Sequence, residues 1–157
     1  MTEDDESKAL KHAYRLLGYR DRSVSEMRER LKNKEFSGSV IEHVLSQLTK
    51  DGLLDDEEMA RRYVEWSKDR KPMGRRRLRL ELEKKGIDRQ IIDNVLNEMM
   101  NRNLEEQLAE RAVSQRGGVP SKNLPDKERQ KKLRRVFSHL LRRGFSRPLA
   151  RRILFED

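Results

Sequence analysis

The residues of this sequence whose number and spacing could support binding chemistry are arginine and lysine. Of its 157 residues, 37 are Lys or Arg and 28 are Asp or Glu, so the formal net charge is +9. This surplus predicts a polyanionic partner: nucleic acid, an anionic membrane or an acidic protein surface. The surplus is uneven, because residues 1–55, 56–104 and 105–157 carry net charges of −1, +3 and +7. We therefore expect binding residues in the middle and C-terminal thirds.

The basic residues form clusters that could contact phosphates or an acidic protein surface. One cluster begins a predicted helix after Pro72 and Gly74, another lies on one face of a predicted helix, and a third lies on the last helix. The alternative is a solvated helix surface whose ion pairs contribute little each. The candidate residues for binding DNA or a partner are Arg75, Arg76, Arg77, Arg79, Lys84, Lys85, Lys131, Lys132, Arg134, Arg135, Arg142, Arg143, Arg147, Arg151 and Arg152.

Residues suited to catalysis or metal binding form no pattern. His12, His43 and His139 are scattered without metal-ligand spacing, and there is no cysteine for a zinc-thiolate site or thiol catalysis. The segment 118–122 lacks the Gly-Lys-Ser/Thr ending of a phosphate-binding loop. We expect a protein that is not an enzyme, with no catalytic residue, metal ion or cofactor.

The sequence also bears on where the protein acts. An absence of cysteine suits the reducing cytoplasm. The acidic residues 1–6 do not resemble a signal peptide. No apolar run approaches the roughly 20 residues that span a bilayer. We therefore expect a cytoplasmic protein that does not cross or bind a membrane.

The elements that must position these residues follow a repeat. Six apolar positions recur three times, at offsets of 51 and then 58 residues, and a basic stretch with a turn separates the second position from the third. Gly86 and Gly144 stand in that turn, where a helix needs a left-handed cap. Glu35 takes this place in the first copy, where we expect a different cap. The positions are Met27, Leu31, Phe36, Val40, Val44 and Leu45; Leu78, Leu82, Ile87, Ile91, Val95 and Leu96; and Val136, Leu140, Phe145, Leu149, Ile153 and Leu154.

Each copy thus predicts two helices joined by a tight turn, with a further helical stretch ahead of the pair. The fold that we expect is all-α, with about nine helices in three tandem three-helix repeats of helix-turn-helix type. Short junctions favour an elongated row. The predicted domains are residues 1–54, 55–103 and 104–157, with a Gly- and Pro-containing loop insertion near 116–125. The predicted helix caps are Ser23 with Glu26, Ser39 with Glu42, Asp55 with Glu58, Asp88, and Ser146.

The few aromatic residues fall mostly at repeat-matched apolar positions, which predicts core packing. Trp66 lies slightly off the apolar phase of its helix, so we expect it to be half-exposed. Stacking on a nucleic-acid base is the alternative there.

An ordered set of motifs resembles the RecX family of RecA regulators, over nearly the whole chain. One departure is Met59, where the family usually has Phe, a change that a core tolerates. The matching stretches are Arg20-Asp21-Arg22-Ser23 with Glu26-Met27 and Leu31; Asp51-Gly52-Leu53-Leu54-Asp55-Asp56 with Met59-Ala60 and Tyr63-Val64; Gly74 with Arg77-Leu78, Glu81-Leu82 and Lys84-Lys85-Gly86-Ile87; and Arg142-Arg143-Gly144-Phe145 with Ile153-Leu154.

The resemblance implies a negative regulator that lies in the groove of the RecA filament on single-stranded DNA. Such proteins limit filament extension or stability and thereby reduce ATP hydrolysis, strand exchange and coprotease activity. The resemblance also implies nonspecific binding to single-stranded DNA, with double-stranded DNA left open, and we expect a monomer. The alternative is a nonspecific DNA-binding helix-turn-helix protein without a recombinase partner. A membrane-surface protein is less favoured, because the repeat assigns the apolar helix faces to internal cores.

Overall fold

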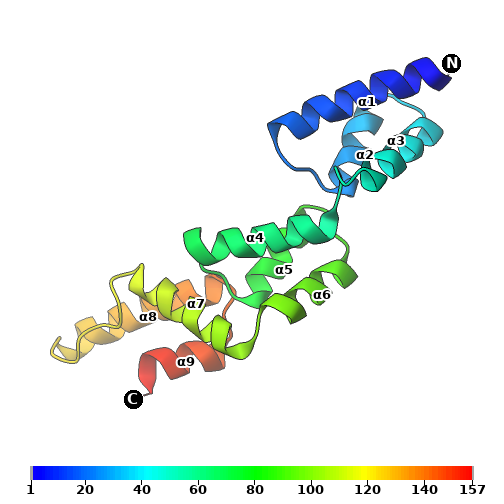
Figure 1. The fold of residues 1–157 in the computed structure, drawn as a ribbon. Helices are drawn as coiled ribbons and strands as arrows, with labels where there is room; N and C mark the ends of the chain where they lie inside the picture. The colour runs from blue at the N-terminus through cyan, green and yellow to red at the C-terminus, as the bar shows by residue number, and fades with distance from the viewer. Residues whose placement is uncertain (1, 157) are drawn as a thin grey trace. The chain divides into compact units, whose positions relative to one another are not determined.

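A computed structural model describes residues 2–156, and within that range the chain forms nine α-helices and no strand (Figure 1). The all-α prediction, with three helices in each copy of the repeat, is confirmed. The first three helices are α1 (Thr2–Tyr19), α2 (Val24–Asn33) and α3 (Gly38–Lys50); the next three are α4 (Asp56–Arg70), α5 (Arg75–Lys84) and α6 (Arg89–Met99); and the last three are α7 (Arg102–Ser114), α8 (Asp126–Arg142) and α9 (Arg147–Phe155).

Two compact units are distinguished by their internal packing. One comprises the residues up to Arg62 together with Leu82–Ile92, and the other comprises Tyr63–Glu81 together with the residues from Asp93 on. Each helix of the middle group therefore contributes to both units. The predicted limit between residues 54 and 55 falls between α3 and α4, whereas the limit between 103 and 104 falls inside the first turn of α7. As domain limits, both stay predictions.

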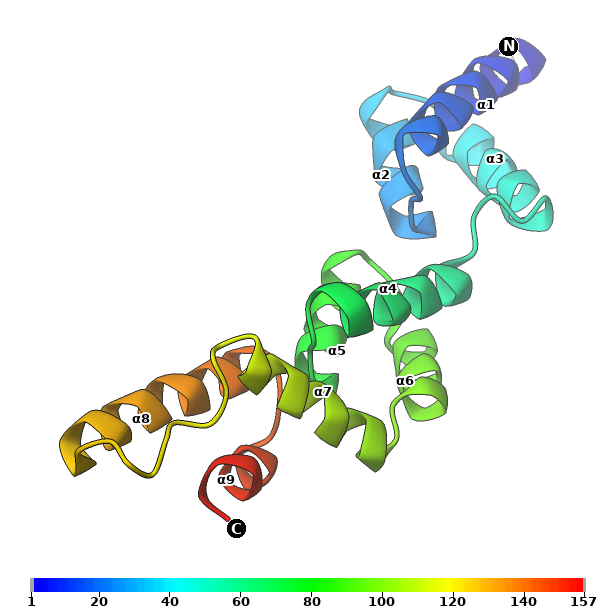
Figure 2. The same ribbon diagram turned by 60° about the vertical axis from the view of Figure 1, so that its left-hand side comes forward.

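The first unit is built around a three-helix core. Helix α1 packs against α2 and α3, which also pack against each other (Figures 1 and 2). The apolar stripe of α1 contributes Ala9 and Ala13, whose small side chains let the helices approach closely, and Met27 and Leu31 of α2 are fully buried. In the second unit α7, α8 and α9 pack against one another in the same way.

The repeat-matched apolar positions form the cores. They are all buried except Phe36, Ile91 and Ile153, which are partly buried. In the second copy Ile92, the residue after Ile91, is fully buried, so it contributes more to the core than Ile91 does. Every one of these positions is thus at least partly removed from water, which is what a repeating helix face requires.

The turns inside the three pairs share one hydrogen-bonding pattern. In the first, the N–H of Phe36 donates to the carbonyl of Leu31 and the N–H of Glu35 to that of Lys32, and the turns at Gly86 and Gly144 repeat both bonds. This is the Schellman cap. Our expectation of a different cap at Glu35 was wrong: Glu35 takes the left-handed conformation, with φ of 66°, despite its Cβ.

Side chains cap four helices as the sequence predicts, among them α6, where Asp88 accepts from the backbone N–H of Gln90 at 2.9 Å. Ser23, Asp55 and Ser146 each accept from the backbone N–H three residues on. The cap predicted at Ser39 was wrong, because α3 begins at Gly38 and Ser37 accepts from Val40 N–H instead. Asn101 caps α7, and this cap was not predicted from the sequence.

Candidate partner and nucleic-acid interface

Two glycines bring the basic stretches of α5 and α8 together. The N–H of Gly74 donates to the carbonyl of Arg143 at 2.7 Å. A Cβ on Gly74 would lie 2.4 Å from the carbonyl oxygen of Gly144, and one on Gly144 would lie 2.3 Å from the backbone nitrogen of Arg77. Only glycine permits backbones to approach so closely. We call this contact the glycine junction.

Arg75 and Arg79 of α5 make contacts with α6 that stabilise the fold. The Arg75 guanidinium donates to the carbonyls of Leu96 and Met100 and to the side chain of Asn97, so it satisfies the open carbonyls at the end of α6. Arg79 pairs with Asp93 at 2.9 Å. These two predicted binding residues already have partners within the chain.

Arg77 and Arg143 are also engaged at the junction. Arg77 pairs with Glu81 at 2.9 Å, and Arg143 donates to the carbonyl of Pro72 at 3.3 Å. Burial, together with the positive charges of Arg116 and Arg77, lowers the pKa of Arg143. Arg143 thus lies among other guanidinium groups, with its side chain directed to a backbone carbonyl.

Arg76 and Arg142 differ, because both are exposed and neither has an ion pair with a carboxylate in residues 2–156. They line one hollow of about 340 Å³ beside the glycine junction, together with Arg77 and the exposed side chain of Leu80. The two sequence clusters, one before and one after the third-repeat insertion, therefore meet at one place.

The basic face of α8 continues from Arg142. A second hollow of about 500 Å³ contains no acidic side chain. Leu133 and Val136 are buried on the opposite face of the helix, as the sequence pattern predicts. The residues that line this hollow, which we call the α8 groove, are Arg116, Lys131, Arg134, Arg135, Ser138 and Arg142.

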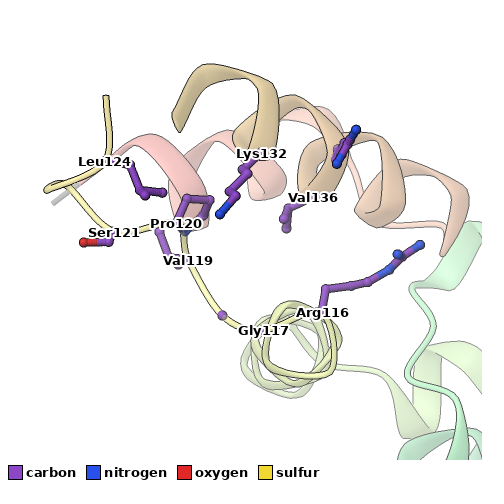
Figure 3. Close-up of a pocket in the computed structure, with 10 residues that line it drawn as sticks. Arg116, Gly117, Val119, Pro120, Ser121, Leu124, Lys132 and Val136 are labelled. Carbon is purple, nitrogen blue, oxygen red and sulfur yellow. The ribbon is translucent and has the colours of Figure 1, made fainter. Parts of the chain in front are cut away.

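Arg116 is a candidate binding residue that was not predicted from the sequence. It directly follows the last turn of α7 at an exposed position, yet it lines both the α8 groove and a further pocket beside it. Figure 3 shows it beside that pocket, where Lys132 and Val136 point from α8 toward the loop of Val119 and Pro120. It could not be recognised from charge clustering, because it lies in a Gly-rich loop and not in a run of basic residues.

His139 lies beneath this basic surface. It is buried, and its Nε2 has no hydrogen-bond partner among the described residues. Burial together with Arg116, Arg143 and Arg142 lowers its pKa to about 4. The imidazole is therefore neutral near pH 7, and it adds no charge to the groove.

The remaining predicted cations lie apart from the groove. Arg147 and Arg151 on α9 are exposed, Arg152 pairs with Glu106, and Lys132 pairs with Glu128 at 3.7 Å while also lining the pocket in Figure 3. Lys84 and Lys85 belong to the first unit and have interactions of their own. The carbonyl of Lys85 accepts from the Ser23 hydroxyl at 2.5 Å.

Trp66 is half-exposed, as predicted. Its ring lies 5.4 Å from that of Tyr63 in a tilted arrangement. Burial raises the pKa of Tyr63, so Tyr63 is the inner member of the pair. An exposed indole supported by a second ring could stack on a base.

The described residues offer neither a metal site nor a membrane-spanning helix. Between residues 2 and 156 no group of three or more His, Cys, Asp or Glu residues is placed to hold a metal ion. None of the helices there is both long and apolar enough to cross a membrane.

Family models and relatives match this chain along most of its length. The model "RecX, first three-helix domain" matches residues 9–48, and "RecX, second three-helix domain" matches residues 55–96. The Regulatory protein RecX of Prosthecochloris aestuarii is 35% identical over 160 residues, which cover 99% of this chain and 97% of the relative. That of Amycolatopsis mediterranei is 31% identical over 155 residues, covering 99% and 86%.

Two solved structures share the fold. A crystal structure of regulatory protein RecX has a TM-score of 0.77 and 27% sequence identity, and the match covers 97% of this chain and 74% of that one. The crystal structure of RecX from Lactobacillus salivarius has the same TM-score of 0.77 at 24% identity, covering 96% and 94%. At that identity the second likeness establishes the fold alone.

Proposed function

The chain belongs to the RecX family of regulatory proteins, and from this membership we propose that it is a non-catalytic negative regulator of the RecA recombinase. In this proposal it binds the RecA filament on single-stranded DNA and limits the filament's extension or stability. ATP hydrolysis, strand exchange and coprotease activity fall as a result. We further propose that it acts as a monomer in the cytoplasm.

The observation that carries the proposal is a group of exposed cations gathered around two hollows whose linings contain no acidic side chain, and none of these cations pairs with a carboxylate in residues 2–156. Such groups keep their charge available for phosphates or for carboxylates of a partner, unlike those already paired within the chain. The six that line the hollow beside the glycine junction and the α8 groove belong to the second unit, and α8 supplies four of them. They are Arg76, Arg116, Lys131, Arg134, Arg135 and Arg142.

The binding mode that follows is electrostatic and independent of base sequence. Arg76 and Arg142 are held beside each other by the glycine junction, so a phosphate or carboxylate near them meets two guanidinium groups at once. The linings of the two hollows contain no Asn or Gln side chain of the kind that identifies base edges in sequence-specific recognition.

The test is RecA ATP hydrolysis on single-stranded DNA, titrated with this protein from far below to equal stoichiometry. We expect hydrolysis to fall at low ratios, because one bound regulator affects many filament subunits. A fall only near saturation would instead indicate competition for DNA. Unchanged hydrolysis at equimolar protein and low salt would overturn the proposal.

The same unpaired cations favour a second candidate, a nonspecific DNA-binding protein without a recombinase partner. It predicts tight binding to bare DNA that weakens steeply with salt, and no dependence on RecA. Comparing affinity for bare and RecA-coated single strands separates the two candidates.

A further inference from the structure

The pocket between the third-repeat loop and α8 has a composition unlike that of the rest of the basic surface. It measures about 600 Å³ and combines aliphatic side chains with three cations (Figure 3). We propose that it docks an acidic segment of a partner protein through one apolar anchor side chain. We call it the loop pocket; its lining is Arg116, Gly117, Gly118, Val119, Pro120, Ser121, Leu124, Lys132, Arg135 and Val136.

The loop that forms one wall is held in place by the end of α7. Gly117 and Gly118 have φ of 93° and 86°, and their N–H groups donate to the carbonyls of Ser114 and Val113, both at 3.0 Å. These bonds cap α7 and turn the chain toward α8. The Ser121 hydroxyl accepts from Asn123 N–H at 3.1 Å, so the far side of the loop is also ordered. Hydrogen bonds within the chain thus hold both ends of the wall.

The apolar part of the pocket is exposed in the free protein. Val119 is 49% exposed, and Pro120 and Leu124 beside it are partly buried. An aliphatic or aromatic side chain inserted between this loop and Val136 would remove that surface from water. Removing that apolar surface from water favours binding.

The charge of the pocket selects an acidic occupant. Arg116, Lys132 and Arg135 line it and no acidic residue does. Only Lys132 among these cations has an ion pair with a carboxylate of the described chain, at the long distance of 3.7 Å to Glu128. A partner segment with carboxylates on either side of its anchor would meet this arrangement with complementary charge.

A peptide fits the pocket better than a nucleotide does. Base recognition on such surfaces relies on stacking against aromatic rings, and the lining contains none. Aliphatic side chains with a cationic rim instead match an apolar residue flanked by acids. This inference concerns a site outside the glycine junction and does not depend on whether the partner is RecA.

The test uses the full-length protein and three fluorescein-labelled probes. The first is a short peptide of Glu and Asp residues with one central Leu, the second has Ser in place of that Leu, and the third is an oligothymidylate. Fluorescence anisotropy gives the affinity for each. We expect the Leu peptide to bind about tenfold more tightly than the Ser peptide, which corresponds to partial burial of the anchor.

Two variants separate the apolar contribution from the electrostatic one. Val119→Ser should abolish the preference for the Leu peptide and leave binding of the Ser peptide unchanged. Arg135→Gln should weaken both peptides alike. Leu53→Ser, at another half-exposed aliphatic position, and Arg15→Gln, at another exposed cation, are the matched controls in the first unit and should change nothing.

Equal binding of the two peptides to the unaltered protein would overturn the proposal. It would also be overturned if oligothymidylate displaced the Leu peptide and lost affinity through Val119→Ser, because the occupant would then be nucleic acid. Neither result would bear on inhibition of RecA ATP hydrolysis, which is measured separately.

Discussion

Glu35 ends α2 in a backbone conformation that its side chain disfavours. The left-handed region costs an L-residue about 1–2 kcal/mol, and the equivalent positions in the other two repeats are Gly86 and Gly144. Glu35→Gly removes this cost but adds flexibility to the unfolded chain. We expect the free energy of unfolding to rise by about 0.5–1 kcal/mol, measured by urea denaturation.

Lys34→Gly is the control for this prediction, because Lys34 has φ of −87° and gains nothing from glycine. It should lower the free energy of unfolding by about 0.5 kcal/mol. A Glu35→Gly variant no more stable than the unaltered protein would mean that the turn does not strain Glu35.

Gly74 is required because of what lies opposite it. In Gly74→Ala the new methyl would overlap the backbone of Gly144 and weaken the 2.7 Å hydrogen bond from Gly74 to Arg143. We expect a loss of roughly 1–3 kcal/mol in the free energy of unfolding. Gly18→Ala, with nothing within 4 Å of the added carbon, should be neutral or slightly stabilising. Equal effects of the two substitutions would show that the glycine junction is not tight.

His139 makes stability depend on pH. Its pKa of about 4 in the folded protein lies below the ordinary value of 6.5, so the unfolded chain binds the proton more readily. Its neutral form therefore contributes fully above pH 6.5, and this contribution is lost as the pH falls from 6.5 toward 4. We expect the free energy of unfolding to drop by roughly 1–2 kcal/mol between pH 7 and pH 5 on account of this group.

Chemical denaturation at the two pH values, repeated for His139→Leu, measures that contribution. The variant should lose the corresponding part of the pH dependence, whereas a variant of the exposed His43, such as His43→Gln, should keep it. Identical profiles for His139→Leu and the unaltered protein would show that His139 titrates normally.

At the scale of helices, the positions of the elements could be predicted from the sequence because they depend on the local spacing of apolar residues. The three-fold recurrence of Leu31, Leu82 and Leu140 placed the second helix of each repeat correctly, and all three side chains are fully buried. Cap positions were less certain, because Ser37 and Ser39 are equally good caps by residue type and only the register of α3 selects Ser37.

The site could be predicted only in part, for a physical reason. Charge clusters are visible in a sequence, but the partners that neutralise them are not. Nothing near Arg75 in the sequence shows that it binds the end of α6, and nothing near Gly74 shows that Gly144 lies against it. Tertiary contacts of this kind decide which arginines remain available for a partner.

Helix α8 carries the most available charge, which leads to a prediction about the whole element. Arg134 and Arg135 are exposed and form no ion pair with a carboxylate in the described residues 2–156. Replacing both by Glu should weaken binding to the RecA filament by at least about tenfold and change the free energy of unfolding by less than about 0.5 kcal/mol. Co-sedimentation with RecA filaments measures the first effect and urea denaturation the second.

The matched control is the reversal of Arg15 and Arg30 to Glu, which makes the same charge change at exposed positions of the first unit. This control should retain filament binding. If both double variants weakened binding equally, net charge rather than the α8 groove would determine the interaction.

For the whole molecule, the distribution of charge predicts how binding responds to salt. On bare single-stranded DNA the logarithm of the association constant should fall against the logarithm of salt concentration with a slope of about −0.7 for each phosphate contacted. Contact through most of the six cations that line the hollow beside the glycine junction and the α8 groove would give a slope near −3 to −4.

A RecA-coated strand presents protein surface as well as phosphate, whereas bare DNA presents phosphate and bases alone. A salt titration can detect this difference between the two strands. Contacts with protein bury apolar groups and release fewer counterions, so we expect a shallower slope and an affinity at least about tenfold higher than for bare DNA at physiological salt. Measuring both strands by anisotropy over the same salt series, with the Arg134 and Arg135 reversal in parallel, gives the comparison. Equal affinities with equal steep slopes would mean that this chain recognises only phosphate, and would favour the plain DNA-binding protein over the filament regulator.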